Sequence, residues 1–149
     1  MSELRELYQE VILDHNKRPR NTGPLDGATN EAEGHNPLCG DRISLHVKLD
    51  DDLVEDIRFE GQGCAISTAS ASLMTEAVKG RSIDEAHELF ARFHKMVAQD
   101  GDHAEWPEEL ASLEALAGVK EFPVRIKCAT LAWHTLEAAL KGERSVSTE

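Results

Sequence analysis

The chain has few of the features that would place it at a membrane or on nucleic acid. Its 149 residues contain no long apolar run, and the longest uncharged stretch, 61–75, is rich in small and hydroxyl side chains. The 16 Lys and Arg are outnumbered by 28 Asp and Glu, for a formal net charge of −12, and no basic patch could neutralise phosphates. Residues 1–20 are charged throughout and lack the apolar run of a signal peptide. We therefore expect a cytoplasmic protein with neither nucleic acid nor a membrane as its partner.

Cysteine is also scarce: the three copies, Cys39, Cys64 and Cys128, lie far apart in the sequence. An odd number of cysteines cannot pair completely, and a reducing cytosol disfavours disulfides. The Cys-x-x-Cys pairs that make zinc ribbons recognisable are absent as well. The residues alone leave three possibilities: metal binding, nucleophilic chemistry, or inert burial as small apolar side chains.

The hydrophobic pattern predicts a single α+β domain over 1–149, with a small antiparallel sheet of about three strands packed against several helices. Apolar residues alternate over 43–49, and Leu53, Ile57 and Phe59 share one parity, which predicts a hairpin with a solvated acidic tip at 50–52. A weaker alternation within 25–34 suggests an edge strand. Helices are predicted at 2–14, 65–80, 82–97, between 107 and 118, and from about 128 to 140, with a frayed tail beyond Gly142.

Each cysteine lies at a predicted junction. Cys39 is in a loop that enters the first clear strand, where Gly40 lets the backbone turn so that Cys39 and Asp41 can face one centre. Cys64 stands between a strand and a helix, and Cys128 is expected to open the last helix. A helix N-terminus favours a thiolate, so two of the three thiols are expected in such an environment.

Three thiolates and one carboxylate would complete a tetrahedral zinc site. The candidate ligands are Cys39, Asp41, Cys64 and Cys128. In such a sulfur-rich set, the hard oxygen of Asp41 is the ligand expected to yield most easily. The spacing by itself leaves this interpretation open.

Several short motifs stand along the chain between about Leu4 and Leu140. They are Leu7-Tyr8, Asp14-His15, Pro19-Arg20-Asn21, Gly34-His35-Asn36-Pro37-Leu38-Cys39-Gly40-Asp41, Phe59-Glu60-Gly61-Gln62-Gly63-Cys64-Ala65-Ile66-Ser67, Ala69-Ser70-Ala71-Ser72 and Lys127-Cys128. Together they resemble the IscU/SufU family of iron–sulfur cluster assembly proteins. The resemblance implies an α+β fold and a metal site at Cys39, Asp41, Cys64 and Cys128.

Three features of this chain differ from IscU-type scaffolds and resemble the SufU branch of the family. Lys127 stands where those scaffolds have a histidine before the third cysteine, so Asp41 is the expected fourth ligand. The segment 121–125 replaces the Leu-Pro-Pro-Val-Lys motif that a dedicated chaperone recognises in IscU scaffolds. A helix-sized insertion at about 99–118 separates the second and third cysteines.

The SufU resemblance implies a zinc-dependent sulfurtransferase. The resemblance further implies that Cys39 accepts persulfide sulfur from a pyridoxal-phosphate cysteine desulfurase of the SufS type. It also implies that the protein activates this desulfurase and that Suf cluster-assembly proteins act downstream. Arg125 matches a basic position beside the family site, and an ordinary surface arginine is the other interpretation. Two alternatives stay open. One is a scaffold on which a transient iron–sulfur cluster is assembled, and the other is a purely structural zinc domain, which the single carboxylate ligand disfavours.

Four histidines have simpler interpretations than metal binding. His15 is expected to be structural or a partner contact, and His46 falls on the polar face of its strand, where it is expected to be solvated. His87 and His94 lie on one predicted helix without the i, i+4 spacing of a helical zinc pair. Trp106 and Trp133 are expected in the core.

Overall fold

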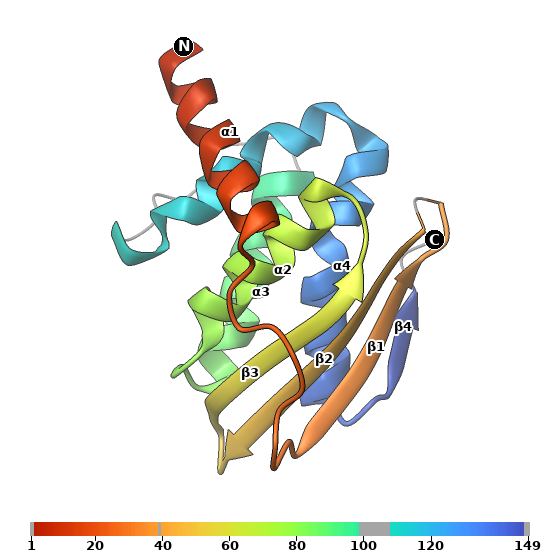
Figure 1. Ribbon diagram of the computed structural model, residues 1–149. Coiled ribbons are helices and arrows are strands. Elements are labelled where there is room, and N and C mark those ends of the chain that lie inside the picture. Colours follow the sequence, from red (N-terminus) through yellow and green to blue (C-terminus); the bar gives the residue numbers. More distant parts are fainter. Residues whose placement is uncertain (1, 39, 99–107, 148–149) are drawn as a thin grey trace.

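The centre of the molecule is a four-stranded sheet in the order β3-β2-β1-β4 (Figure 1). The computed structural model describes residues 2–38, 40–98 and 108–147. Three strands are antiparallel neighbours, and the short fourth strand pairs in parallel with the first. Their bounds are β1 Asn30–Asn36, β2 Asp41–Asp50, β3 Leu53–Gln62 and β4 Ser145–Ser147. The α+β class is confirmed. The expectation of a frayed tail is wrong for 145–147, because these residues pair with β1.

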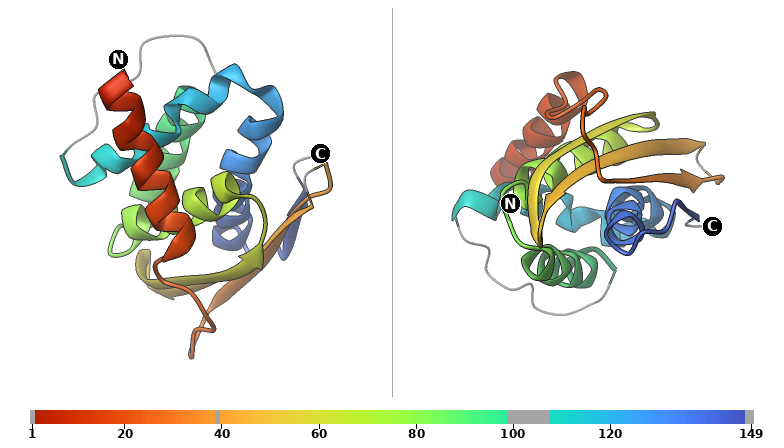
Figure 2. Two further views of the ribbon diagram at one scale, coloured as in Figure 1. Left: turned by 45° about the horizontal axis from the view of Figure 1, so that its top comes forward. Right: turned by 90° about the horizontal axis from the view of Figure 1, so that it is seen from below.

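Helices cover one face of this sheet. The long helix α4 lies along β1 and β2, α2 packs on β3 and α4, and α1 packs on α2 (Figures 1 and 2). The helices are α1 Ser2–Lys17, α2 Ala65–Val78, α3 Ile83–Ala98, the 3-10 helix η1 Glu108–Glu121, and α4 Pro123–Leu140. None of the helices in the described ranges is long and apolar enough to cross a membrane. The predicted insertion at 99–118 lies partly outside the described residues, and its second half forms η1.

The β2–β3 hairpin follows the predicted alternation, with one difference. Leu45 and Val47 on β2 face Phe59 and Ile57 on β3, and all four side chains are buried. A register shift between Lys48 and Leu49 then reverses the parity at the hairpin tip. Val54 is therefore buried, whereas Leu53, expected on the inner face, is 41% exposed.

The first strand lies elsewhere than expected. The weak alternation placed an edge strand within 25–34, but β1 begins at Asn30 and reaches Asn36, and β2 and β4 flank it on its two sides. Gly34 lies where β1 crosses α4, because a Cβ at this position would collide with the side chain of Thr135. Two residues further on, Asn36 at the end of β1 contacts Cys128 in the first half of α4.

Two sequence predictions about the helices are confirmed, one in the core and one at the start of α3. Trp133 on α4 is fully buried and stacks on Phe93 of α3, with ring centroids 4.6 Å apart. Ser82 and Glu85 form the predicted capping box at the start of α3, since each residue's side chain accepts the backbone N–H of the other at 3.1 Å. Trp106 lies outside the described residues.

Candidate metal centre

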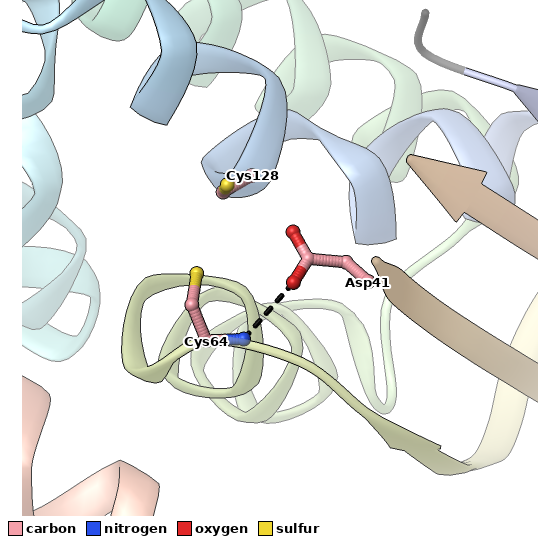
Figure 3. A group of neighbouring side chains, drawn as sticks. All are labelled: Asp41, Cys64 and Cys128. Atoms are coloured by element: carbon pink, nitrogen blue, oxygen red, sulfur yellow. Dashed lines mark hydrogen bonds between the residues drawn. The ribbon is translucent and has the colours of Figure 1, made fainter. Parts of the chain in front are cut away.

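Three side chains from separate elements converge at one end of the sheet. Asp41 begins β2, Cys64 precedes α2, and Cys128 lies on α4 (Figure 3). Their ligand atoms all lie within 4.8 Å of one another. Two sulfur ligands bound at about 2.3 Å in a tetrahedral zinc site are about 3.8 Å apart. The three groups are therefore close enough to bind one ion after small side-chain movements.

Asp41 is fixed in a buried position. It is 0% exposed, and its Oδ1 accepts the backbone N–H of Cys64 at 2.9 Å. Its Oδ2 is buried and has no hydrogen-bond partner among the described residues. An uncompensated buried carboxylate oxygen is costly in a protein interior. A cation beside the two thiols would supply the missing interaction, so this oxygen fits a metal ligand.

The close approach of Asp41 depends on a glycine that the sequence analysis did not single out. A Cβ at Gly63 would stand 2.6 Å from Oδ1 of Asp41. A larger residue would therefore displace the carboxylate. The Gly-x-Gly-Cys motif contains this glycine, but the sequence did not reveal that it makes room for the Asp41 carboxylate.

Cys64 has the predicted environment at the start of a helix. It is the N-cap residue of α2, and its Sγ accepts the backbone N–H of Ser67 at 3.4 Å. The exposed N–H groups and the dipole of a helix N-terminus both stabilise negative charge. The Cys64 sulfur therefore lies at the helix terminus that the sequence predicted for it.

The predicted position of Cys128 is wrong. The last helix begins at Pro123, five residues before Cys128, because proline is well suited to the first helical turn. Cys128 is consequently fully buried in the second turn, and its thiol contacts the carbonyl of Val124 at 3.8 Å. Cys128 therefore lacks the environment of a helix N-terminus that the sequence predicted for it.

A side-chain amide contacts Cys128 instead. Nδ2 of Asn36, which is 0% exposed, donates to the Cys128 Sγ at 3.8 Å. Sequence reasoning did not assign Asn36 a role, although it stands in the Asn-Pro-x-Cys-Gly-Asp motif. A basic group lies beside the thiols as well, since the negative charge of Cys64, followed by that of Cys128, raises the pKa of the exposed Arg125.

Cys39 lies outside the described residues, so its part in the centre stays a prediction. The residues around its loop are described. Asn36 and Asp41 form the last pair of the β1–β2 ladder, and residues 37–40 therefore join the two strands. Gly40 adopts a φ of +71°, the left-handed conformation that glycine permits.

The histidines have partners away from these ligands. His15 is buried and structural, as one of its two interpretations predicted, with Nδ1 at 2.7 Å from Oγ of Ser72. His46 is not simply solvated, because its two ring nitrogens lie 2.6 Å and 3.0 Å from carboxylate oxygens of Glu31 and Glu60. Among the described residues, no histidine belongs to a group that could hold a metal.

Comparison with known proteins gives consistent matches over nearly the whole chain. Residues 7–129 match the family model of the NifU-like N-terminal domain. An iron–sulfur cluster assembly scaffold protein IscU from Streptococcus pyogenes is 51% identical, covering 95% of this chain and 87% of that protein. The zinc-dependent sulfurtransferase SufU of Bacillus subtilis is 49% identical, covering 94% and 93%. A crystal structure of a candidate scaffold protein for the SUF system from Fervidobacterium islandicum has a TM-score of 0.80 at 36% identity, covering 91% and 98%.

Proposed function

The chain belongs to the family of the NifU-like N-terminal domain, and is an iron–sulfur cluster assembly protein of the IscU/SufU type. From that premise we propose that it is a zinc-dependent sulfurtransferase. Its substrate is the persulfide of a pyridoxal-phosphate cysteine desulfurase of the SufS type, and Cys39 is the acceptor. The observation that carries the proposal is the cluster of two thiols and a buried carboxylate oxygen without a hydrogen-bond partner.

The donor set suits zinc in particular. Thiolates and a single carboxylate are accepted ligands of tetrahedral zinc, and Cys39 would complete the set of Asp41, Cys64 and Cys128. A bound zinc ion would supply the charge that keeps the thiols deprotonated at neutral pH. Arg125 adds a further positive charge beside the two thiols. We propose that this arrangement keeps the cysteines deprotonated and reduced, and therefore not paired in a disulfide.

The transfer step needs no external oxidant. The thiolate of Cys39 attacks the terminal sulfur of the desulfurase persulfide, and a new S–S bond forms. The old S–S bond breaks, and its electron pair leaves on the desulfurase thiolate. Cys39 ends as a persulfide and the donor returns to a free thiolate, so the proton on the terminal sulfur and the total oxidation state are both conserved.

Among the four proposed ligands, Cys39 is the one suited to leave the centre. Asp41 is 0% exposed and accepts the Cys64 N–H, so it is more firmly held than its hard oxygen alone suggested. Cys128 is equally buried on α4. Cys39 belongs to the short connection between β1 and β2, and connecting loops are in general more mobile than the elements they join.

The surface near the thiols supports docking of a protein donor. Three large apolar side chains are exposed there, on the Cys39 loop and at the start of α4: Leu38 at 63%, Phe122 at 60% and Val124 at 55%. Apolar residues grouped around a reactive group are typical of a partner surface. We propose that the desulfurase covers them when its persulfide reaches Cys39, and that Suf cluster-assembly proteins receive the sulfur afterwards.

Cluster scaffolding is the second candidate function, because an IscU scaffold is as similar to this chain as SufU is. The same four residues would then hold a transient iron–sulfur cluster. In that case iron and sulfide, added anaerobically to the metal-free protein, give a cluster that transfers to an acceptor protein. Tight zinc retention with no such cluster favours sulfur transfer.

The deciding experiment replaces Cys39 by serine and measures desulfurase turnover and zinc content beside the unchanged protein. We expect stimulation of the desulfurase to disappear while binding between the two proteins, measured by calorimetry, persists. Undiminished stimulation refutes Cys39 as the acceptor. A structural zinc domain would instead lose stability in the Cys39→Ser variant and unfold on metal removal.

A further inference from the structure

Asn36 lies where the proposed ligands meet, although it is not itself a ligand. It is the last residue of β1, pairs directly with Asp41 across the ladder, and precedes the loop that carries Cys39. Its side chain also reaches Cys128. One residue is thus linked to three of the four ligands that the proposed function requires.

Both ends of the Asn36 amide are used. Nδ2 donates to the Cys128 Sγ at 3.8 Å, and Oδ1 accepts the backbone N–H of Leu38 at 3.2 Å. The second contact is an Asx-turn, in which an asparagine oxygen replaces a backbone acceptor and shapes the start of a loop. The amide orientation is consistent with both contacts, because rotating it would place its oxygen against the sulfur and its nitrogen against an N–H.

We propose that Asn36 is a positioning residue that makes Cys128 a retained, weakly nucleophilic ligand and fixes the turn that leads to Leu38. An N–H donor draws electron density from a thiolate, which makes that sulfur a poorer nucleophile and orients its lone pairs. Cys128 has no helix N-terminus to do this, since α4 begins at Pro123. The side-chain amide takes the place of the backbone donor that Ser67 provides for Cys64.

This inference rests on the proposed function only for its ligand set. It explains how cysteine side chains of the same chemistry can have different roles at the proposed metal centre. The Cys64 and Cys128 sulfurs each accept an N–H bond, and Cys128 is fully buried as well. These N–H bonds assign Cys64 and Cys128 the role of retained ligands.

The test uses two variants and a matched control in the full-length protein. Asn36→Asp keeps an oxygen acceptor for the Leu38 N–H but loses the donor to sulfur, whereas Asn36→Ala loses both. Asn30→Asp is the control, because Asn30 lies at the opposite end of the same strand and donates to the Ala139 carbonyl, away from the thiols. Thermal melts check that each variant is folded.

The readout is the cobalt(II)-substituted protein, whose sulfur-to-cobalt charge-transfer bands report the electron density on the ligands. We expect these bands to move to longer wavelength in Asn36→Asp and Asn36→Ala and to stay in place in Asn30→Asp. Zinc affinity, measured by competition with a chromophoric chelator, should fall by roughly ten- to a hundredfold in both Asn36 variants, as is usual for groups that support a ligand. The control should keep its affinity.

Unchanged bands and zinc affinity in the Asn36 variants overturn the proposal, and so does an equal loss in Asn30→Asp. If Asn36→Asp does not fold, Asn36→Ala decides by the same criteria. No desulfurase is present in these measurements. A failure of desulfurase stimulation in the unchanged protein would therefore refute the sulfurtransferase function without touching this result, and the reverse also holds.

Discussion

Replacing Gly63 by alanine tests the position of the Asp41 carboxylate beside Cys64. The new Cβ would stand 2.6 Å, 3.1 Å and 3.2 Å from Oδ1, Cγ and Cβ of Asp41. Non-bonded carbon and oxygen atoms need about 3.3 Å, so the carboxylate must retreat by roughly 0.7 Å. That movement breaks the bond from the Cys64 N–H. A hydrogen bond to a charged group contributes roughly 1.5–3 kcal/mol, and we expect Gly63→Ala to lower the unfolding free energy by about that amount.

The displaced carboxylate should also bind metal less well. We expect the zinc affinity of Gly63→Ala to fall at least roughly tenfold, measured by chelator competition, with urea unfolding as the stability assay. Gly118→Ala is the matched control, because Gly118 has no atom within 4 Å of a built Cβ and no left-handed φ. Its stability should change by less than about 0.5 kcal/mol. Normal zinc affinity and stability in Gly63→Ala would refute the placement of Asp41.

Three further predictions concern the stability of the fold at residues that are not proposed metal ligands. Burial lowers the pKa of His15 and of His134 on α4, so these two side chains bind protons more readily in the unfolded chain. Their contribution to the free energy of unfolding is therefore complete above the ordinary histidine pKa of about 6.5. It is lost as the pH falls through the lower pKa values of the folded protein. Urea midpoints between neutral and mildly acidic pH check this, and His134→Phe should flatten the dependence. Trp133→Ala should cost roughly 3–5 kcal/mol by leaving a cavity beside α3, and a change under about 1 kcal/mol contradicts the stacked core. Ser82→Ala should cost about 1 kcal/mol in thermal unfolding by removing the capping bond to Glu85, with no effect on zinc binding.

The sequence predicted best where a feature depends on neighbours in the chain. Strand alternation over 43–49 and the helix that starts after Cys64 both arise from local periodicity and capping, and both are confirmed. The sequence predictions failed where segments far apart in the chain pair with one another or where the register of two strands shifts. The register shift between Lys48 and Leu49 reversed the burial of Leu53 and Val54, and β4 joined the sheet from the far end of the chain.

The candidate site divides in the same way. The motifs around Asp41 and Cys64 identified their chemistry, since the residue types and the strand-to-helix junction are local properties of the chain. Cys128 was assigned the wrong environment, because the sequence did not reveal that Pro123 would begin the helix. The amide that replaces the helix terminus at its sulfur comes from Asn36, on a different element.

By itself, then, the sequence determined the family, the α+β class and which side chains are candidate metal ligands. Only the tertiary structure decided that Asp41, Cys64 and Cys128 meet, and that the Asp41 carboxylate is buried and accepts the Cys64 N–H. The physical reason is distance along the chain. Motifs record what each residue can do, whereas the packing of α4 against β1 and β2 and of α2 against β3 decides which of them share one buried space.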